Sequence, residues 1–239
     1  NGIKIAIEQI GLQEGHEIAM GHTVSSANRM AYTMKEPIGV VAAISAFNHP
    51  FNLAVHQVIP AIAVGCPVII RPATQTPMSA IKLVEILKEA GLPNGWAQAV
   101  VCDRVAGELL VTSPKTAFFT FIGSGPVGWY LNSKASAGTR SALEHGGVAP
   151  VIVEPDADIE SMIPDLVKGG FYHAGQVCVS VQRIFVQESI VDIVASKIAE
   201  KASKLVVGNQ LDPKTEVGPL INHNEVNRVE EWVNEAVTK

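Results

Sequence analysis

Residues 39–144 alternate between short apolar runs and longer segments whose apolar residues recur every three to four positions. Such short runs are typical of strands buried on both faces of a sheet, and the longer segments have the spacing of amphipathic helices. Because single helices separate the strands, we predict an α/β fold with a parallel sheet covered on both faces, an array of the kind that binds a dinucleotide. Strands are expected at residues 39–44, 67–72, 97–101, 117–121 and 140–144.

The pattern restarts after Gly147, with strands expected at 151–153 and 183–186 and helices at 159–169 and 190–205. We place a domain boundary at Gly146-Gly147, which gives domains of residues 1–146 and 147–239 with a cleft between them, a common position for an active site. Residues 17–37 carry two extended pieces, which predict a hairpin arm. The chain opens and closes inside helical segments, so we expect a fragment of a longer protein.

The composition indicates a globular chain and argues against several classes of function. Hydrophobic residues make up 47% of the 239 positions and charged residues 17%, as in a globular chain with a real core. The net charge is −5 and Lys and Arg form no dense cluster, so nucleic acid is an unexpected partner. The longest apolar runs are too short for a membrane span. Three scattered cysteines fit a reducing cytoplasm better than a disulfide framework.

Two residues near the predicted boundary carry candidate chemistry. Cys178 follows Gly175-Gln176-Val177 and precedes a predicted strand, where a lone thiol among small residues could act as a nucleophile. Glu144 ends a predicted strand shortly before two glycines, so the backbone can approach a ligand and the carboxylate could activate water. Taken singly, a buried structural thiol and a solvated glutamate are the commoner roles.

Three further candidate binding features each have an ordinary structural alternative, so none of them indicates a function by itself. Asn48 could donate its side-chain amide to an oxyanion, or could form an Asx turn before the following helix. The turn Gly123-Ser124-Gly125 could hold a phosphate at a helix N-terminus, although an ordinary tight turn fits it equally well. Arg71 ends a strand and could reach a phosphate or a ribose, or be a surface charge.

Five motifs then occur in a specific order: Phe47-Asn48-His49-Pro50, Arg71-Pro72-Ala73, Phe121-Ile122-Gly123-Ser124, Glu144-His145-Gly146-Gly147 and Gly175-Gln176-Val177-Cys178. Their order and spacing resemble the NAD(P)-dependent aldehyde dehydrogenase superfamily over essentially the whole chain. The resemblance implies a Rossmann-type cofactor sheet followed by an incomplete α/β catalytic domain. It also implies oxidation of an aldehyde to a carboxylic acid with NAD or NADP. Cys178 would be the nucleophile, Asn48 and the Cys178 N–H the oxyanion donors, and Glu144 the base for the hydrolytic water.

The same resemblance implies a set of cofactor-binding positions: Ile44, Ser45, Phe47, Arg71, Thr74, Phe121, Gly123, Ser124, Val127, His145 and Gly146. No metal is expected. Arg71 stands where the family usually has lysine, and its forked guanidinium would contact ribose or phosphate differently. Thr74 stands where many NAD-preferring members carry glutamate. A neutral threonine removes the repulsion of a 2′-phosphate, so we expect NADP to be usable.

His49 and His56 are two helical turns apart and share a helix face. By the resemblance they line the substrate tunnel, where many members place aromatic residues. Imidazoles there would favour a small polar or anionic aldehyde, and purely structural histidines are the alternative. A small aldehyde is thus the expected partner, with neither nucleic acid nor a membrane. For the full-length protein we expect a cytoplasmic location and a homodimer or homotetramer.

Other functions stay open at this point. A CoA-acylating aldehyde dehydrogenase passes the acyl group to CoA and generally lacks the base, so Glu144 argues against it. An inactive structural role is possible for this chain, because the family's second cofactor-binding glutamate would lie beyond Lys239. A Cys/His hydrolase would need a histidine near Cys178, and His173 is the only local candidate.

Overall fold

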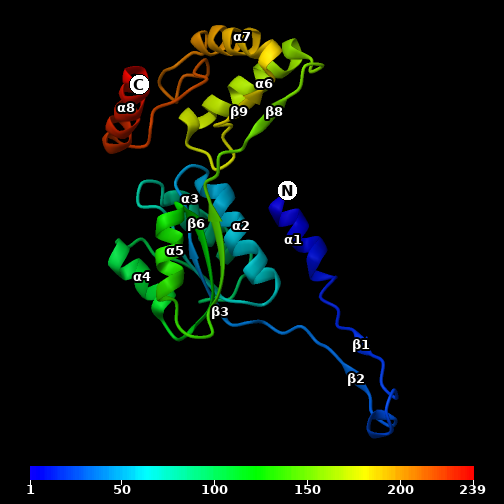
Figure 1. Ribbon diagram of the computed structural model, residues 1–239. Coiled ribbons are helices and arrows are strands. Elements are labelled where there is room, and N and C mark those ends of the chain that lie inside the picture. The colour runs from blue at the N-terminus through cyan, green and yellow to red at the C-terminus, as the bar shows by residue number, and fades with distance from the viewer. The chain divides into compact units, whose positions relative to one another are not determined.

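The computed structural model describes residues 1–239 and separates into two compact units, Asn1–His145 and Gly146–Lys239. The first unit contains a five-stranded sheet in the order β5-β4-β3-β6-β7. Its strands β3 and β6 are labelled in Figure 1. All its neighbouring strands pair in parallel, which confirms the predicted fold class. The strands are β3 (Val40–Ile44), β4 (Val68–Arg71), β5 (Ala97–Ala99), β6 (Thr116–Gly123) and β7 (Arg140–His145).

Helices cover both faces of this sheet: α2 (Pro50–Ala63), α3 (Met78–Glu89), α4 (Arg104–Thr112) and α5 (Gly125–Lys134), with α1 (Gly2–Ile10) packed on α2. Successive side chains of a strand point to opposite faces. Accordingly Val41 and Ala43 of β3 join the core beneath α2 and α3. Ala42 and Ile44 join the second core, beneath α4 and α5. Strand β3 is therefore buried on both sides, as its unbroken apolar run predicts.

Glycine ends α2 and α3 in the same way. Gly65 has φ +80 and Gly91 has φ +95, a left-handed conformation that glycine adopts without a Cβ clash. At the first of these ends, the Gly65 N–H donates to the carbonyl of Ile62 and the Cys66 N–H to that of Ala61. This paired arrangement satisfies the last carbonyls of α2 and turns the chain directly into β4.

The predicted arm is an antiparallel pair of very short strands, β1 (Glu17–Ile18) and β2 (Ala31–Tyr32), joined through the 3₁₀ turn η1 (Val24–Ser26). Its apolar side chains are exposed, with Val24 at 99% and Met30 at 83%. Each strand has only two residues, so the strands are shorter than the extended pieces expected from the sequence.

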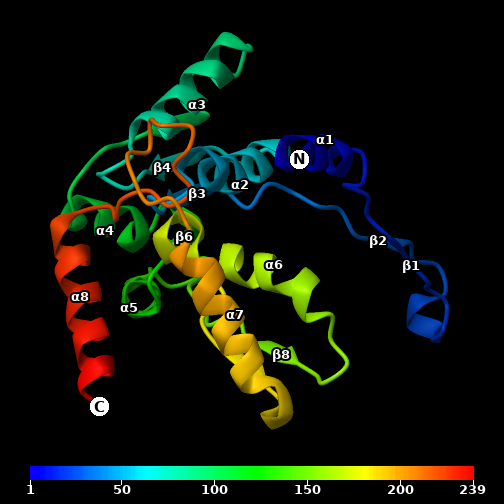
Figure 2. The same ribbon diagram turned by 90° about the horizontal axis from the view of Figure 1, so that it is seen from above.

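The second unit is built on a two-stranded parallel sheet of β8 (Val151–Val153) and β9 (Ile184–Val186). Val153, Ile163, Val167 and Val194 form its core, where α6 (Ile159–Phe171) and α7 (Val191–Ser203) pack together (Figure 2). The remaining elements are η2 (Tyr172–Gly175), η3 (Glu188–Ile190) and α8 (His223–Thr238). Across both units, no helix combines the length and apolar character that a membrane crossing requires.

Candidate active site

The carboxyl ends of the first unit's strands bring most of the predicted cofactor positions to one edge. Ile44 pairs with Arg71 of β4 on one side and with Phe121 of β6 on the other. Gly123 pairs with His145 at the end of β7. Strand β3 leads into α2 and β6 leads into α5, and these helices cover opposite faces. The adjacent ends of β3 and β6 therefore form a topological switch point, where open α/β sheets bind ligands.

The segment after β3 is fixed by hydrogen bonds on both sides. The Ser45 N–H donates to the carbonyl of Arg71 at 3.0 Å, and the Thr76 hydroxyl donates to the carbonyl of Phe47 at 3.3 Å. Asn48 is half-buried, and its Oδ1 accepts a hydrogen bond from the His49 N–H at 3.1 Å. This last contact orients the side-chain amide at the start of α2.

The imidazole of His145 packs against the glycine-rich turn that follows β6. A Cβ on Gly128 would lie 2.2 Å from Nε2 of His145, so only glycine lets α5 approach β7 this closely. The His145 ring packs edge-on against Trp129 and Phe121, with centroid separations of 5.5 and 6.1 Å. Ser124 is the N-cap residue of α5 and makes no side-chain capping bond. The helix start is thus the kind of N-terminus that holds a phosphate.

Three buried polar atoms near the carboxyl ends of the strands have no hydrogen-bond partner: Ser45 Oγ, Gln57 Oε1 and His145 Nε2. A buried hydroxyl without a partner is costly in isolation, and a bound polar ligand or water relieves that cost. Together with the glycine-rich start of α5, Ser45 offers a hydroxyl and backbone N–H groups at one sheet edge. These residues fit the ribose and phosphate groups of a dinucleotide.

Gln57 was not among the sequence-predicted residues. Its Nε2 donates to the carbonyls of Ile44 and Thr120 at 3.1 and 3.2 Å, so it ties α2 to the ends of both β3 and β6. The signal was visible in the sequence, because Gln57 is a polar residue on an otherwise apolar helix face. What the sequence could not show is which strands the amide would reach.

The predicted phosphate or ribose contact, Arg71, is engaged with the backbone. Its Nε donates to the carbonyl of Asp103 at 3.2 Å and its Nη2 to that of Cys102 at 3.0 Å. A Cβ on Gly107 would lie 2.6 Å from the Arg71 side chain, so glycine makes room for the guanidinium. Thr74, the predicted determinant of cofactor choice, is exposed, and its hydroxyl donates to Gln75.

Glu144 is the next-to-last residue of β7. It pairs with Ile122 of β6 and is exposed. The strand ladder thus fixes its backbone, and its carboxylate is open to solvent. Gly146 follows one residue after the strand ends, in an open position where no heavy atom lies within 4 Å of an added Cβ.

Cys178 belongs to the second unit, in the loop between η2 and β9. It is exposed, whereas Cys66 is 1% exposed and Cys102 is half-buried. Ahead of it His173, Ala174 and Gly175 all have left-handed backbones, with φ of +52, +55 and +72. For residues with a Cβ this conformation costs about 1–2 kcal/mol each. Backbone strain of this kind is concentrated at functional sites in proteins.

Gln176, which was also not among the site residues predicted from the sequence, holds this loop in place through hydrogen bonds. Its Oε1 accepts a hydrogen bond from the Ile221 N–H at 2.9 Å, and its Nε2 donates to the carbonyl of His173 at 3.0 Å. The loop end is held as well, since the Val181 N–H donates to the carbonyl of Gly169 in α6 at 3.1 Å. The strained turn therefore presents Cys178 from a loop fixed at both ends.

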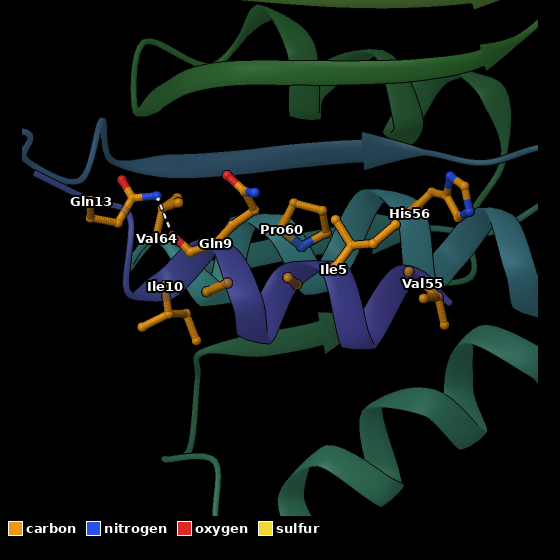
Figure 3. A pocket seen from close by; sticks show the side chains of 11 residues that line it. Ile5, Gln9, Ile10, Gln13, Val55, His56, Pro60 and Val64 are labelled. Carbon is orange, nitrogen blue, oxygen red and sulfur yellow. Dashed lines mark hydrogen bonds between the residues drawn. The ribbon is translucent and has the colours of Figure 1, made fainter.

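The two histidines on α2 have different surroundings. His49 is the N-cap residue of α2, and its side chain makes no capping bond. His56 is exposed and lines a groove of about 240 Å³ between α1 and α2. Figure 3 shows His56 and Val55 at one end of this groove and Ile10 at the other. The groove is largely apolar, so His56 is one of its few polar groups.

A parallel sheet with a glycine-rich switch point defines an α/β protein of the dinucleotide-binding type, and the second unit presents an exposed thiol. Residues 3–239 match the family model described as the aldehyde dehydrogenase family, and the chain belongs to that family.

Named relatives and solved structures agree with this assignment. The chain is 44% identical to a 3-sulfolactaldehyde dehydrogenase of Priestia aryabhattai over 98% of its length and 49% of the relative's. It is 37% identical to a betaine aldehyde dehydrogenase of Cereibacter sphaeroides, over 92% of this chain and 46% of that one. The crystal structure of glyceraldehyde-3-phosphate dehydrogenase GapN from Methanocaldococcus jannaschii, complexed with NADP, superimposes with a TM-score of 0.91 at 37% identity, covering 99% and 52%. The chain thus spans about half the length of the curated relatives it matches.

Proposed function

We propose that the full-length protein oxidises small aldehydes to carboxylic acids with NAD or NADP. Cys178 supplies the nucleophile. Its thiolate attacks the carbonyl carbon to form a hemithioacetal, and the oxyanion is stabilised by the Asn48 amide and the Cys178 N–H. The bound dinucleotide supplies the chemistry of accepting a hydride. Glu144 then takes a proton from water, which attacks the resulting thioester and releases the acid and the free thiol.

The observation that carries this proposal is the contrast among the three cysteines. Cys178 alone is exposed, and it alone follows a strained and braced turn. Such a position suits a thiol that must meet a substrate, whereas Cys66 is packed in the core. The family membership of the chain supplies the reaction class, and the retained Glu144 favours water over CoA as the acyl acceptor.

The test uses the protein at its full encoded length. Cys178→Ser should lower kcat by at least about 10³-fold, because an alkoxide forms far less readily than a thiolate. Cys102→Ser is the matched control and should retain activity, since only the backbone carbonyl of Cys102 has a role at Arg71. Full activity in Cys178→Ser would refute the nucleophile assignment, and a CoA-dependent acyl product would refute the hydrolytic step.

For the cofactor we propose that NADP is used alongside NAD, because Thr74 is neutral and exposed. Thr74→Glu should shift the ratio of kcat/KM for NADP to that for NAD at least about tenfold toward NAD through charge repulsion of the 2′-phosphate. A wild-type enzyme with strong NAD preference would contradict the proposal.

We also propose that the substrate is a small polar or anionic aldehyde, with His49 and His56 at the substrate mouth. The sulfolactaldehyde and glyceraldehyde-3-phosphate relatives are named for anionic aldehydes, which supports this, whereas the betaine aldehyde relatives are named for a cationic one. If His49→Ala and His56→Ala leave KM for succinic semialdehyde unchanged relative to an alkyl aldehyde, the two histidines have no such role.

For the assembly we propose a homodimer or homotetramer in which the arm meets a second copy. The support is the exposed apolar surface of the arm, including Met30, Tyr32 and Met34. Sedimentation should show a smaller species when Met30 and Met34 are replaced by serine, and an unchanged mass would contradict the role of the arm.

A further inference from the structure

The second unit contains a pocket of about 440 Å³ that is lined in part by the loop carrying Cys178, although Cys178 itself does not line it. Val177 and Val179, the two neighbours of Cys178 in the chain, both line it, together with the buried Ser180. A volume near the lower end of the range for ligand sites suits a molecule of few heavy atoms. Because Val177 and Val179 flank Cys178 in the chain, the pocket lies within reach of a short substrate whose carbonyl meets the thiol.

The facing wall of the pocket comes from the last turns of α6. It consists of Asp165, Lys168, Gly169 and the adjacent Tyr172. Gly169 and the loop are in close contact, since a Cβ on this glycine would lie 2.9 Å from the Val181 side chain. This close contact fixes the distance between the α6 wall and the residues around Cys178.

The pocket wall carries one cation and one anion, Lys168 and Asp165. They are three residues apart on α6 and so lie on neighbouring positions of one helix face. Both side chains are exposed, and neither takes part in an ion pair within 4.0 Å. Neither charge is therefore held in a salt bridge.

Relatives of this chain are named for aldehydes of opposite charge, so membership of the family does not decide which charge this protein prefers. The groups lining the pocket must decide it. A lysine ammonium is a point charge on a long flexible stem and can follow a carboxylate, sulfonate or phosphate. The Asp165 carboxylate is on the same wall and disfavours a substrate with excess negative charge.

We propose that Lys168 is a specificity-determining residue that holds the anionic group of the substrate while Cys178 attacks the carbonyl. Asp165 opposes this preference and limits its strength. The inference rests on the proposed oxidation of aldehydes and adds to it the residue that selects substrate charge. It places this selection on the α6 wall of the pocket, in addition to any contribution of the histidines on α2.

The experiment compares succinic semialdehyde with butanal, an uncharged aldehyde of equal chain length, on the full-length protein. Lys168→Met should lower the ratio of their kcat/KM values about ten- to a hundredfold, the range expected for one lost charged hydrogen bond. Lys168→Arg should restore most of the ratio. Asp165→Asn should raise it, because a like charge is removed. Lys201→Met, an exposed lysine on α7 outside the pocket, is the matched control and should leave the ratio unchanged.

Each result decides something. A ratio that is the same in Lys168→Met and wild type, in an enzyme that oxidises both aldehydes, overturns the assignment of Lys168 and leaves the proposed function intact. A fall of the ratio in Asp165→Asn overturns it too, since the pocket would then not favour anions over neutral aldehydes through these groups. A protein that oxidises neither aldehyde refutes both proposals. Product inhibition by succinate gives a second readout and should weaken in Lys168→Met by the same factor as the ratio.

Discussion

The two units hold their share of the proposed site by different means. In the first unit, Asn48, Arg71 and Glu144 lie at or just beyond the ends of strands whose register the parallel ladder fixes. In the second unit, Cys178 is presented by a loop whose preceding residues have left-handed backbones and whose ends are tied by hydrogen bonds. A buried sheet thus positions several groups without backbone strain, whereas a loop that exposes one thiol needs strain and side-chain braces.

The first way to test this contrast is to remove core volume from the sheet. Phe119 is 0% exposed, and Phe119→Ala should destabilise the first unit by about 3–5 kcal/mol. Phe185→Ala, at a side chain that is 55% exposed in the second unit, is the control and should cost much less. Denaturant titration followed by tryptophan fluorescence would measure both. Equal losses of unfolding free energy in the two variants would contradict a first unit whose stability depends on the buried side chains of its sheet.

The second prediction concerns the sheet's contribution to chemistry. Asn48→Ala should lower kcat by about 10²–10³-fold with little change in KM, as for removal of one oxyanion donor. Asn94→Ala, at an exposed loop position, is the matched control. Steady-state kinetics on the full-length protein decide the outcome. A rise in KM at constant kcat would instead assign Asn48 to ground-state binding.

The third prediction tests the strained turn. Ala174→Gly removes the Cβ clash of a left-handed residue but adds freedom to the unfolded chain, so it should change stability by less than about 1 kcal/mol, in the stabilising direction. Ala195→Gly, in the exposed interior of α7, should destabilise by about 0.5–1 kcal/mol. The opposite signs are the diagnostic result. Two losses of similar size would mean that position 174 carries no backbone strain.

The smallest effect concerns surface contacts between helices. Tyr130 of α5 donates to Glu108 of α4 at 3.0 Å, and this hydrogen bond and the nearby charge raise the pKa of Tyr130 above its ordinary value of 10.0. Since the folded pKa is the higher one, the contact stabilises fully below pH 10.0 and its contribution is lost as pH rises through the folded pKa. A pH titration followed by tyrosinate absorbance should show one phenol that ionises above the ordinary range for tyrosine, and Glu108→Gln should lower the pH at which it ionises. An unchanged titration would mean that the contact is absent in solution.

Much of the fold was predictable because apolar periodicity reports burial directly. The strands of the first unit start and end close to the expected residues. Thr76 is the type of residue that often caps a helix, but α3 begins at Met78 with Pro77 at its N-cap, and the Thr76 hydroxyl donates to the carbonyl of Phe47 instead. A tertiary hydrogen bond took the place of a local one.

The hydrogen bonds that Gln57 and Gln176 make around the site were not predictable, because they join residues far apart in the chain. Gln57 reaches Thr120, 63 positions away, and Gln176 reaches Ile221, 45 positions away. Local patterns carry no record of such partners. The candidate residues themselves could be selected from motifs and their order, but the engagement of Arg71 with two backbone carbonyls follows only from the fold.

The packing of Arg71 against Gly107 has an evolutionary consequence. Any larger residue at position 107 would push the guanidinium away from the carbonyls of Cys102 and Asp103. A lysine at position 71, which lacks the forked guanidinium, would leave room for more side chains at position 107. With arginine at position 71, substitutions at the two positions are coupled, and a change at one alters which residues the other can hold.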